Sequence, residues 1–404
     1  MRRLSSEAGE PSVSERARLV FTTLYVACVV VFLTGVAGFY RPGLGFTSML
    51  RFGEDFESRV IPELRREPHF VVRGKGYDGQ FYAQLAAKPV PWDPSVRRAL
   101  DNPPYRSGRI VPSLVAYALA VGNPARAMHV FAVMNVAVWG VLAWLLLYWF
   151  PPGTTWDFAC WGGILFSAGT MMCVCRALPD FSAFVLIVAA LRFWERGRRN
   201  AAAGMLGLAG LVRETSILAA VMLVTRPSDR KSALGTLGRV ALAGIPALVL
   251  MVGIRLLVAG TSHAASENFG LPFMGMLRRF AQIAEDGFVS SAGVVVTMVA
   301  IVAQAAFFVF PVRLADVRYR LGAVYALLFV VTNDAIWSGY PGSAPRVLLP
   351  LLFAFNLALP RTPRWWPLLV VGNLSVVTGW HNLMHPPKSA ASAATAAAAA
   401  PPSK

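Results

Sequence analysis

Acidic residues are scarce in this sequence. Its 404 residues include 21 Asp and Glu against 38 Lys and Arg, so the formal net charge is +17. The basic residues are spread over many loops rather than gathered along one face or tail, which argues against a nucleic-acid partner. Cysteines number only 4, and all lie in apolar segments. No loop therefore carries the cysteine pair that a structural disulfide needs.

Several motifs of soluble enzymes are also absent. There is no Walker loop, dinucleotide fingerprint, zincin motif or Gly-x-Ser-x-Gly elbow. His381 and His385 are spaced for one helix face, but no third ligand is near them in the sequence, so we do not expect a zinc site. The sequence indicates no certain cofactor.

Apolar residues dominate what is present. They make up 56% of the chain, and the mean hydropathy is +0.53. This composition predicts an all-α polytopic membrane protein, because each span must satisfy its own backbone hydrogen bonds in lipid. We expect a basic cytoplasmic N-terminus at residues 1–18, a transmembrane domain at 19–384, and a disordered tail rich in Ala and Pro at 385–404.

The apolar runs predict about eleven transmembrane helices. A long first exoplasmic loop, 40–109, separates the first two, and a second exoplasmic loop covers 260–290. Short helices at the membrane surface are expected within these loops, at 54–67, 93–100 and 276–288. The spans are 19–39, 110–121, 130–150, 158–178, 181–194, 201–224, 240–259, 291–310, 321–337, 347–359 and 367–383.

One part of this topology has two solutions. The segment 110–121 would rise only about 18 Å as a helix, which is short for a span. The basic loops around residues 196–199 and 226–239 both look cytoplasmic. They lie on the same side if 110–121 does not cross and 201–224 is a hairpin of two half-helices around Arg213-Glu214. The sequence leaves both arrangements open.

The most polar stretch lies between the first two apolar segments, at 74–89. Three glycines within six residues present Asp78 on a tight loop, together with Tyr77, Gln80 and Tyr82. A short amphipathic helix is expected to start just after Asp78 and to stop at Pro89. Asp78 is then either a helix cap, a catalytic group, or both.

Three further polar clusters interrupt the apolar background. Arg106 and Arg109 stand where the first loop re-enters the membrane, as anion-binding groups or as interfacial anchors. Arg213 and Glu214 lie inside an apolar segment, where each charge costs ~2.5–3.5 kcal/mol at mid-bilayer, so they form a structural ion pair or face a substrate. The turn from Tyr340 to Arg346 places an arginine at the outer mouth of a span, to bind phosphate or to snorkel to the interface.

Four short strings support a resemblance to a known superfamily. They are Gly-Tyr-Asp-Gly-Gln-Phe-Tyr (76–82), Tyr-Arg-x-x-Arg-Ile-x-x-Pro (105–112), Leu-x-Arg-Glu-Thr (211–215) and Arg-Val-Leu-x-Pro (346–350). With the two-loop layout, they resemble the membrane glycosyltransferases of the C superfamily, GT-C, and within it a group of largely uncharacterised bacterial membrane proteins. The similarity extends over most of residues 19–384.

This resemblance implies a function. A sugar would pass from a polyprenyl-phosphate donor to a glycan or lipid acceptor of the cell envelope, on the exoplasmic side of the bacterial cytoplasmic membrane. Asp78 would be the general base. Arg346, or Arg106 and Arg109, would stabilise the departing phosphate. Substrate contacts would also involve Tyr77, Gln80, Tyr82, Arg213, Glu214 and Tyr340.

One departure from the superfamily concerns metal binding. Many members carry two adjacent acids in the first loop, whereas Asp78 is single here and Glu54-Asp55 come some twenty residues earlier. A metal held by paired carboxylates is therefore doubtful, and we assign no metal ligand. Two other functions remain open: a lipid or glycolipid transporter or flippase, which needs polar sites at mid-membrane, and a non-catalytic envelope protein, which needs neither Asp78 nor Arg346.

Overall fold

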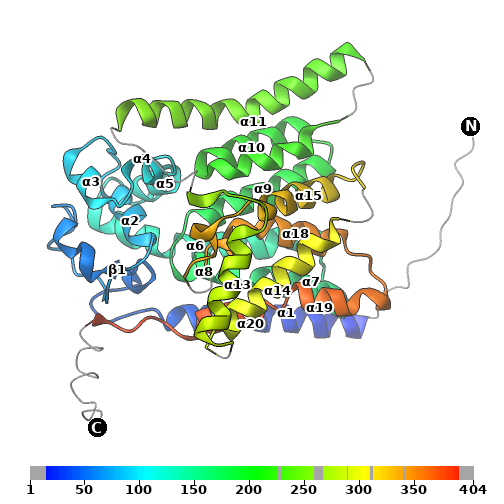
Figure 1. Cartoon of the computed structure of the whole chain (residues 1–404), viewed down its shortest axis with the longest axis horizontal. Coiled ribbons are helices and arrows are strands. Elements are labelled where there is room, and N and C mark those ends of the chain that lie inside the picture. Colours follow the sequence, from blue (N-terminus) through cyan, green and yellow to red (C-terminus); the bar gives the residue numbers. More distant parts are fainter. Residues whose placement is uncertain are drawn as a thin grey trace, which may run out of the picture.

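The computed structural model describes residues 15–225, 229–258, 267–288, 290–309, 313–339 and 342–390. Within these ranges the chain is mostly helical (Figure 1), which confirms the all-α class. The described sheet is minimal. It consists of β1 (Phe52–Gly53) and β2 (Val71–Val72), paired in parallel inside the first loop.

Three described helices are long and apolar enough to cross a membrane: α1 (Glu15–Ala37), α6 (Pro124–Leu146) and α11 (Arg230–Leu257). The pair α7 (Thr155–Leu165) and α8 (Ala168–Cys175) forms a fourth candidate, bent by 42° at a short break. The remaining apolar elements are shorter. They are α9 (Asp180–Glu195), α10 (Arg199–Val212), η3 (Glu214–Leu223), α14 (Ala292–Phe307), α15 (Val317–Val330), α18 (Leu349–Ala358), α19 (Trp366–Gly372) and α20 (Val376–Met384).

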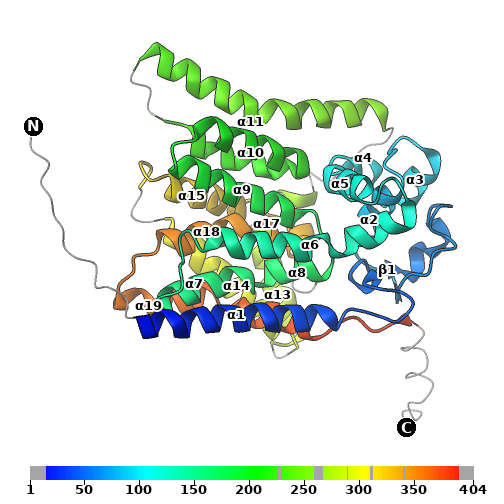
Figure 2. The ribbon, with the colours of Figure 1, turned by 180° about the vertical axis from the view of Figure 1, so that it is seen from behind.

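These helices lie side by side in one bundle. The two opposite views agree that α1 runs along one edge of it and α11 along the other, beside α10 (Figures 1 and 2). Aromatic side chains fill the interior. The ring of Phe32 on α1 stacks on Trp139 of α6 with centroids 3.7 Å apart, and both side chains are buried. The bundle thus has a conventional apolar core.

The first loop forms a lobe at one end of the bundle, which we call the loop lobe (residues 40–109). It contains α2 (Gly79–Ala87), α3 (Pro94–Ala99) and α4 (Pro103–Ser107). The helix expected after Asp78 is therefore present, as is the one expected at 93–100, which Asp93 caps by accepting a hydrogen bond from the backbone N–H of Ser95. The lobe has an apolar core of its own, continuous with α5 (Val111–Leu119) and the start of α6.

The prediction of a surface helix at 54–67 is wrong. The structure has a short 3₁₀ helix, η2 (Glu54–Arg59), followed by turns. Ile61 and Leu64 are fully buried against the lobe, and the backbone N–H of Ile61 donates to the side chain of Gln84 on α2 at 3.0 Å. The apolar side of this stretch packs on protein, which removes the reason for it to lie on a membrane as a helix.

The middle of the chain adopts the second of the two arrangements left open by the sequence. α5 (Val111–Leu119) would rise only about 14 Å, too little to cross a hydrocarbon core of about 30 Å. The segment 199–223 is a hairpin, since α10 ends at Val212 and η3 returns beside it. Arg213 and Glu214 therefore stand at the reversal, on the side of the loop lobe.

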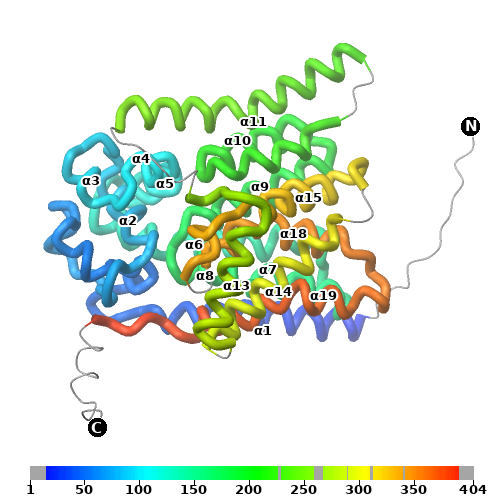
Figure 3. Tube along the Cα trace, viewed as in Figure 1, coloured from blue at the N-terminus to red at the C-terminus, as the bar shows by residue number. Residues whose placement is uncertain are grey.

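The second loop contains the expected amphipathic helix, α13 (Met274–Asp286), which leads into α14 (Figure 3). Ile283 is buried, whereas Leu277 and Phe280 are exposed. α13 packs on α16 (Asp334–Trp337). α17 (Ala344–Val347) then starts the return into α18. Most of the predicted tail, from residue 391, lies outside the described residues.

Candidate functional site

The backbone around Asp78 is held by close contacts within the loop lobe. Gly76 has a φ of +66°, and a Cβ there would collide with the carbonyl oxygen of Arg51, so glycine is required. The side chain of Gln80 closes the loop from inside. Its carbonyl oxygen accepts from the N–H of Gly53 at 2.9 Å, and its amide donates to the carbonyl of Lys75 at 2.7 Å. Gln80 is fully buried and holds the loop in place.

The side chain of Asp78 does not cap α2, although the residue stands at the cap position. Its carboxylate instead accepts hydrogen bonds from two guanidinium groups. Arg106 donates to one oxygen at 2.9 Å and Arg346 donates to the other at 2.8 Å. The predicted capping role is therefore wrong. The carboxylate makes no hydrogen bond to the N-terminus of α2, and both of its oxygens accept from arginines instead.

These arginines determine the protonation state of Asp78. Burial by itself would raise the pKa of this carboxyl, but the charges and hydrogen bonds of Arg106 and Arg346 outweigh it and hold the pKa well below its ordinary value. Asp78 is thus an anion at neutral pH. In this arrangement it is also a weak base.

Arg106 has further partners inside the loop lobe. Its guanidinium also binds Asp101 through two donors, at 2.8 and 2.7 Å, and one Nη approaches the hydroxyl of Tyr82 at 3.4 Å. The rings of Phe81 and Tyr105 lie within cation–π distance of it. Arg106 is therefore fixed inside the lobe and is not an interfacial anchor.

Arg346 connects the lobe to the bundle. It stands on α17, and its second Nη lies 3.5 Å from the carboxylate of Asp180, the first residue of α9. Asp180 also forms an ion pair with Arg213. The side chain of Asp180 is 2% exposed, the lowest value in this cluster. It pairs with arginines of two other elements, Arg346 on α17 and Arg213 at the hairpin reversal.

A second ion pair links the lobe to the hairpin. Arg109 binds Glu214 through two donors, one of which is 3.0 Å from the carboxylate. Arg213, by contrast, turns to Asp180 and donates to the hydroxyl of Thr215 at 2.9 Å. Arg213 and Glu214 therefore do not pair with each other. Each binds a charge from another element, and this fastens the hairpin reversal to the lobe and to α9.

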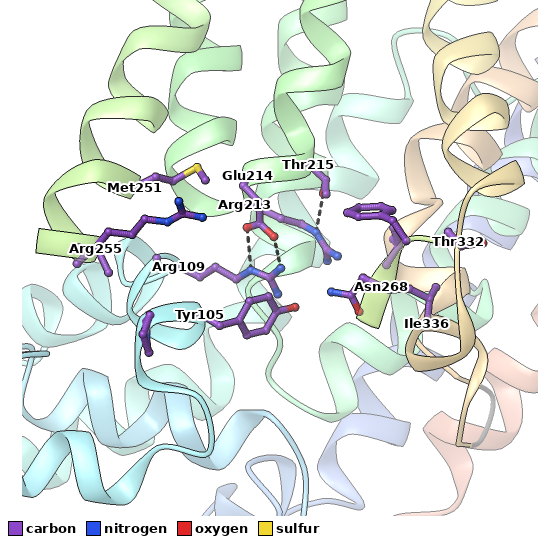
Figure 4. Close-up of a pocket in the computed structure, with 15 residues that line it drawn as sticks. Tyr105, Arg109, Arg213, Glu214, Thr215, Met251, Arg255, Asn268, Thr332 and Ile336 are labelled. Carbon is purple, nitrogen blue, oxygen red and sulfur yellow. Dashed lines mark hydrogen bonds and ion pairs between the residues drawn. The ribbon is translucent and has the colours of Figure 1, made fainter. Parts of the chain in front are cut away.

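A cavity of about 180 Å³ opens beside these pairs. Figure 4 shows Arg109, Arg213 and Glu214 at its centre, with Arg255 of α11 reaching in from one side. Within the described ranges, Arg255 has no carboxylate at ion-pair distance. The cavity therefore has more positive than negative charge. The wall is completed by Pro104, Tyr105, Gly108, Thr215, Met251, Ile254, Asn268, Phe269, Thr332, Ile336 and Val347.

Most of the predicted site residues come together here. Asp78, Arg106, Arg213 and Arg346 form one network of ion pairs with Asp101 and Asp180, and Arg109 and Glu214 form a separate pair. Tyr77 lies beside it, with its ring 4.4 Å from the guanidinium carbon of Arg176 and 5.8 Å from that of Arg346. Tyr340 lies outside the described residues.

The sequence gives no signal for Arg255, and it makes Asp180, which follows Pro179, only a weak candidate as an acid at a membrane boundary. A lone arginine near the end of a span carries no local signal that it faces a cavity. No group of three or more acidic, histidine or cysteine side chains that could hold a metal ion is found in the part of the chain that the structure describes. Glu54 and Asp55 are exposed there, and neither lies in the ion-pair network.

Comparisons with known proteins show no relative. No family model matches the chain, and neither a curated protein nor a solved structure is similar to it.

Proposed function

We propose that this chain is an integral membrane glycosyltransferase that moves a sugar from a polyprenyl-phosphate donor to an acceptor of the cell envelope. The observation that carries the proposal is the pairing of Asp78 with Arg106 and Arg346 next to an arginine-rich cavity. A carboxylate and several guanidinium groups are what this reaction needs. The carboxylate receives a proton, and the cations stabilise the phosphate that leaves.

In the proposed reaction, the acceptor hydroxyl oxygen bonds to the anomeric carbon while the bond from that carbon to the phosphate oxygen breaks. The hydroxyl proton passes to Asp78, and the electron pair of the broken bond stays on the polyprenyl phosphate. Arg346 is the arginine best placed to follow that phosphate, because it contacts Asp78 on one side and the Asp180–Arg213 pair on the other. Guanidinium groups suit phosphate oxygens because they donate two parallel hydrogen bonds.

Donor binding also gives Asp78 its basicity. In the free protein both carboxylate oxygens accept from arginines. A donor phosphate competes with Asp78 for Arg346, and a carboxylate that loses one cation partner becomes a stronger base. The base is therefore released only when the leaving group is in place. This order suppresses proton transfer in the absence of donor.

The proposed orientation places the chain in the bacterial cytoplasmic membrane with its N-terminus in the cytoplasm and the loop lobe outside. The basic loops around residues 196–199 and 313–320 lie at the end of the bundle away from the lobe (Figure 1), as the positive-inside rule requires. We retain about eleven membrane-embedded segments and a GT-C-like layout as part of this proposal, with 199–223 as a hairpin.

The test compares donor binding with turnover. The full chain, purified in detergent, is mixed with a panel of polyprenyl-phosphate sugars, and bound donor and released sugar are measured separately. Asp78→Asn is expected to bind donor and to lose ~10²–10⁴-fold in turnover, the usual contribution of a general base. Arg346→Ala is expected to bind donor weakly. Asp55→Asn, an exposed acid of the same lobe, is the matched control and keeps both properties.

Two results contradict the proposal. One is an Asp78→Asn protein with full transferase activity. The other is a chain that binds no donor from a broad panel. Binding and movement of a lipid-linked sugar without cleavage would identify a transporter or flippase instead.

A further inference from the structure

The cavity beside the hairpin reversal contains a positive charge that the proposed reaction does not use. Its lining includes three arginines, Arg109, Arg213 and Arg255, and one acid, Glu214. Arg109 binds Glu214, and Arg213 pairs with Asp180, which stands outside the lining. Two of the three arginines are therefore neutralised, and the charge of Arg255 is left over.

Arg255 makes neither an ion pair nor a hydrogen bond in the part of the chain that the structure describes. It is the single charged residue of the run 240–258, where a charge is costly unless it meets water or a ligand. Glu267, next to the lining residue Asn268, is exposed and does not line the cavity. Figure 4 shows the Arg255 side chain directed into the cavity rather than away from it. Snorkelling to the interface does not account for this orientation.

The apolar part of the lining reaches the surface of the bundle. Met251 and Phe269 line the cavity, yet 37% and 40% of their surfaces are exposed. Met251 stands on α11, which runs along one edge of the bundle (Figures 1 and 2). The cavity volume of about 180 Å³ is below the ~300–1,000 Å³ of a pocket that encloses a whole ligand. The cavity thus fits a charged head group whose hydrocarbon chain lies outside, against these apolar side chains.

We propose that this cavity binds the phosphate of a membrane amphiphile that carries one negative charge, with Arg255 as its counter-ion and the hydrocarbon chain between Met251 and Phe269. A guanidinium suits this role because it donates two parallel hydrogen bonds to phosphate oxygens. One uncompensated arginine balances the single charge of a phosphodiester. A soluble anion would leave the apolar side chains at the opening without a partner.

The inference rests on the proposed function and adds to it Arg255 and the α11 side of the cavity. Two substrates of that reaction have the required chemistry. One is the polyprenyl-phosphate donor, which is a phosphodiester, and the other is an acceptor that is itself an anionic phospholipid. Binding experiments without a sugar donor separate these two sources and do not depend on turnover.

The experiment titrates two pairs of lipids into the full chain in a neutral detergent, and native mass spectrometry counts the bound lipid. Decaprenyl methyl phosphate, a phosphodiester without a sugar, is compared with decaprenol. Phosphatidylglycerol is compared with diacylglycerol of the same chains. We expect the charged lipid of at least one pair to bind about tenfold more tightly than its neutral counterpart. The polyprenyl pair identifies the donor as the source, and the phospholipid pair identifies the acceptor. Dimethyl phosphate, which has the charge but no chain, is expected not to bind.

Three variants test the location. Arg255→Gln should weaken binding of the charged lipid by about tenfold and leave binding of the neutral lipid unchanged. Because Arg255 is exposed and loses no hydrogen bond, this variant is expected to fold. Arg255→Lys keeps the charge and should retain most of the binding. Arg230→Gln removes the same charge from an exposed position at the other end of α11 and should change neither lipid.

The proposal is overturned if neither charged lipid binds more tightly than its neutral counterpart, or if Arg255→Gln binds the charged lipid as the native chain does. Binding of dimethyl phosphate as tight as that of the lipids would also overturn it. Failure of the proposed function gives a different result. In that case the charged lipid still binds through Arg255, and no polyprenyl-phosphate sugar is cleaved.

Discussion

The carboxylate of Asp78 accepts a hydrogen bond at 2.8 Å from Arg346, which stands 268 positions later in the chain. One residue lies on a loop outside the bundle, and the other lies on a short helix that leads into it. Their contact joins the two parts of the molecule at the point where the proposed reaction occurs.

The pH dependence of stability should show that Asp78 stays ionised. Its pKa lies below the unfolded value of about 3.9, so its contribution to stability is complete above that pH and is lost as the pH falls toward the folded pKa. Asp78→Asn should therefore lower the melting temperature in detergent by the same amount at pH 7.5 and at pH 5. The difference should shrink only below about pH 4.

Asp55→Asn serves as the control for this experiment, because Asp55 is exposed in the same lobe and has no ion-pair partner among the described residues. It should leave the melting temperature unchanged over the same range. If the Asp78→Asn difference instead decays between pH 7.5 and pH 5, the two arginines do not hold the carboxylate as described.

Asp180 should behave as a buried ion-pair partner. Asp180→Asn leaves the buried Arg213 without its acid, so the free energy of unfolding should fall by roughly 3–5 kcal/mol. Replacing both partners, Asp180→Asn with Arg213→Gln, should cost less than the sum of the single changes, because no uncompensated charge remains.

The matched control for Asp180 is the exposed pair of Arg278 and Asp334, which are 2.7 Å apart. Asp334→Asn should change stability by less than about 1 kcal/mol, since solvent screens the pair. If Asp180→Asn and Asp334→Asn lower the free energy of unfolding equally, water screens the Asp180 ion pairs as it screens the exposed pair.

Glu214 should compete with an anionic ligand for Arg109. Glu214→Gln removes the carboxylate that now occupies the guanidinium, so the Kd of a polyprenyl-phosphate donor should fall by up to about tenfold. Arg109→Gln should raise it. Isothermal titration in detergent measures both, and Thr215→Val is the control for a change in the cavity wall that leaves its charge intact.

Gly275 should be intolerant of alanine. A Cβ there would lie 2.6 Å from the carbonyl oxygen of Thr332, so α13 would have to move away from the residues that line the cavity. Inside a helix, Gly→Ala ordinarily stabilises by about 1 kcal/mol. Gly204→Ala on α10, where a Cβ would meet nothing within 4 Å, should show that ordinary gain. Gly275→Ala should destabilise, as measured by thermal melting.

Local patterns in the sequence located most of the helices. The glycines and polar residues of 74–82 predicted a tight loop followed by a helix, and α2 begins directly after Asp78. The amphipathic period of 276–288 predicted α13. The same reasoning failed at 54–67, because the amphipathic pattern does not say whether the apolar side meets lipid or protein. Packing of Ile61 and Leu64 on the lobe decided that question.

The partners of the charged residues had no such local signal. Arg213 and Glu214 are adjacent in sequence, yet they bind Asp180 and Arg109 on other elements. Spacing along the chain says nothing about contacts across 105 or 268 positions. The sequence places Asp78 directly before a helix, which is where a capping residue stands. It does not show that Arg106 and Arg346 bind the carboxylate, because both are distant in the sequence.

The sequence by itself determined that this is an all-α chain of apolar helices with polar residues concentrated in its first loop. Such information is local, because hydropathy and helical period depend on neighbouring residues and on the cost of unsatisfied backbone groups in lipid. Only the tertiary structure decided that three arginines and three acids from the loop lobe, α9, the hairpin and α17 form one network, with the Arg109–Glu214 pair separate from it. Ion pairs follow from how the helices pack, and packing is a property of the whole chain.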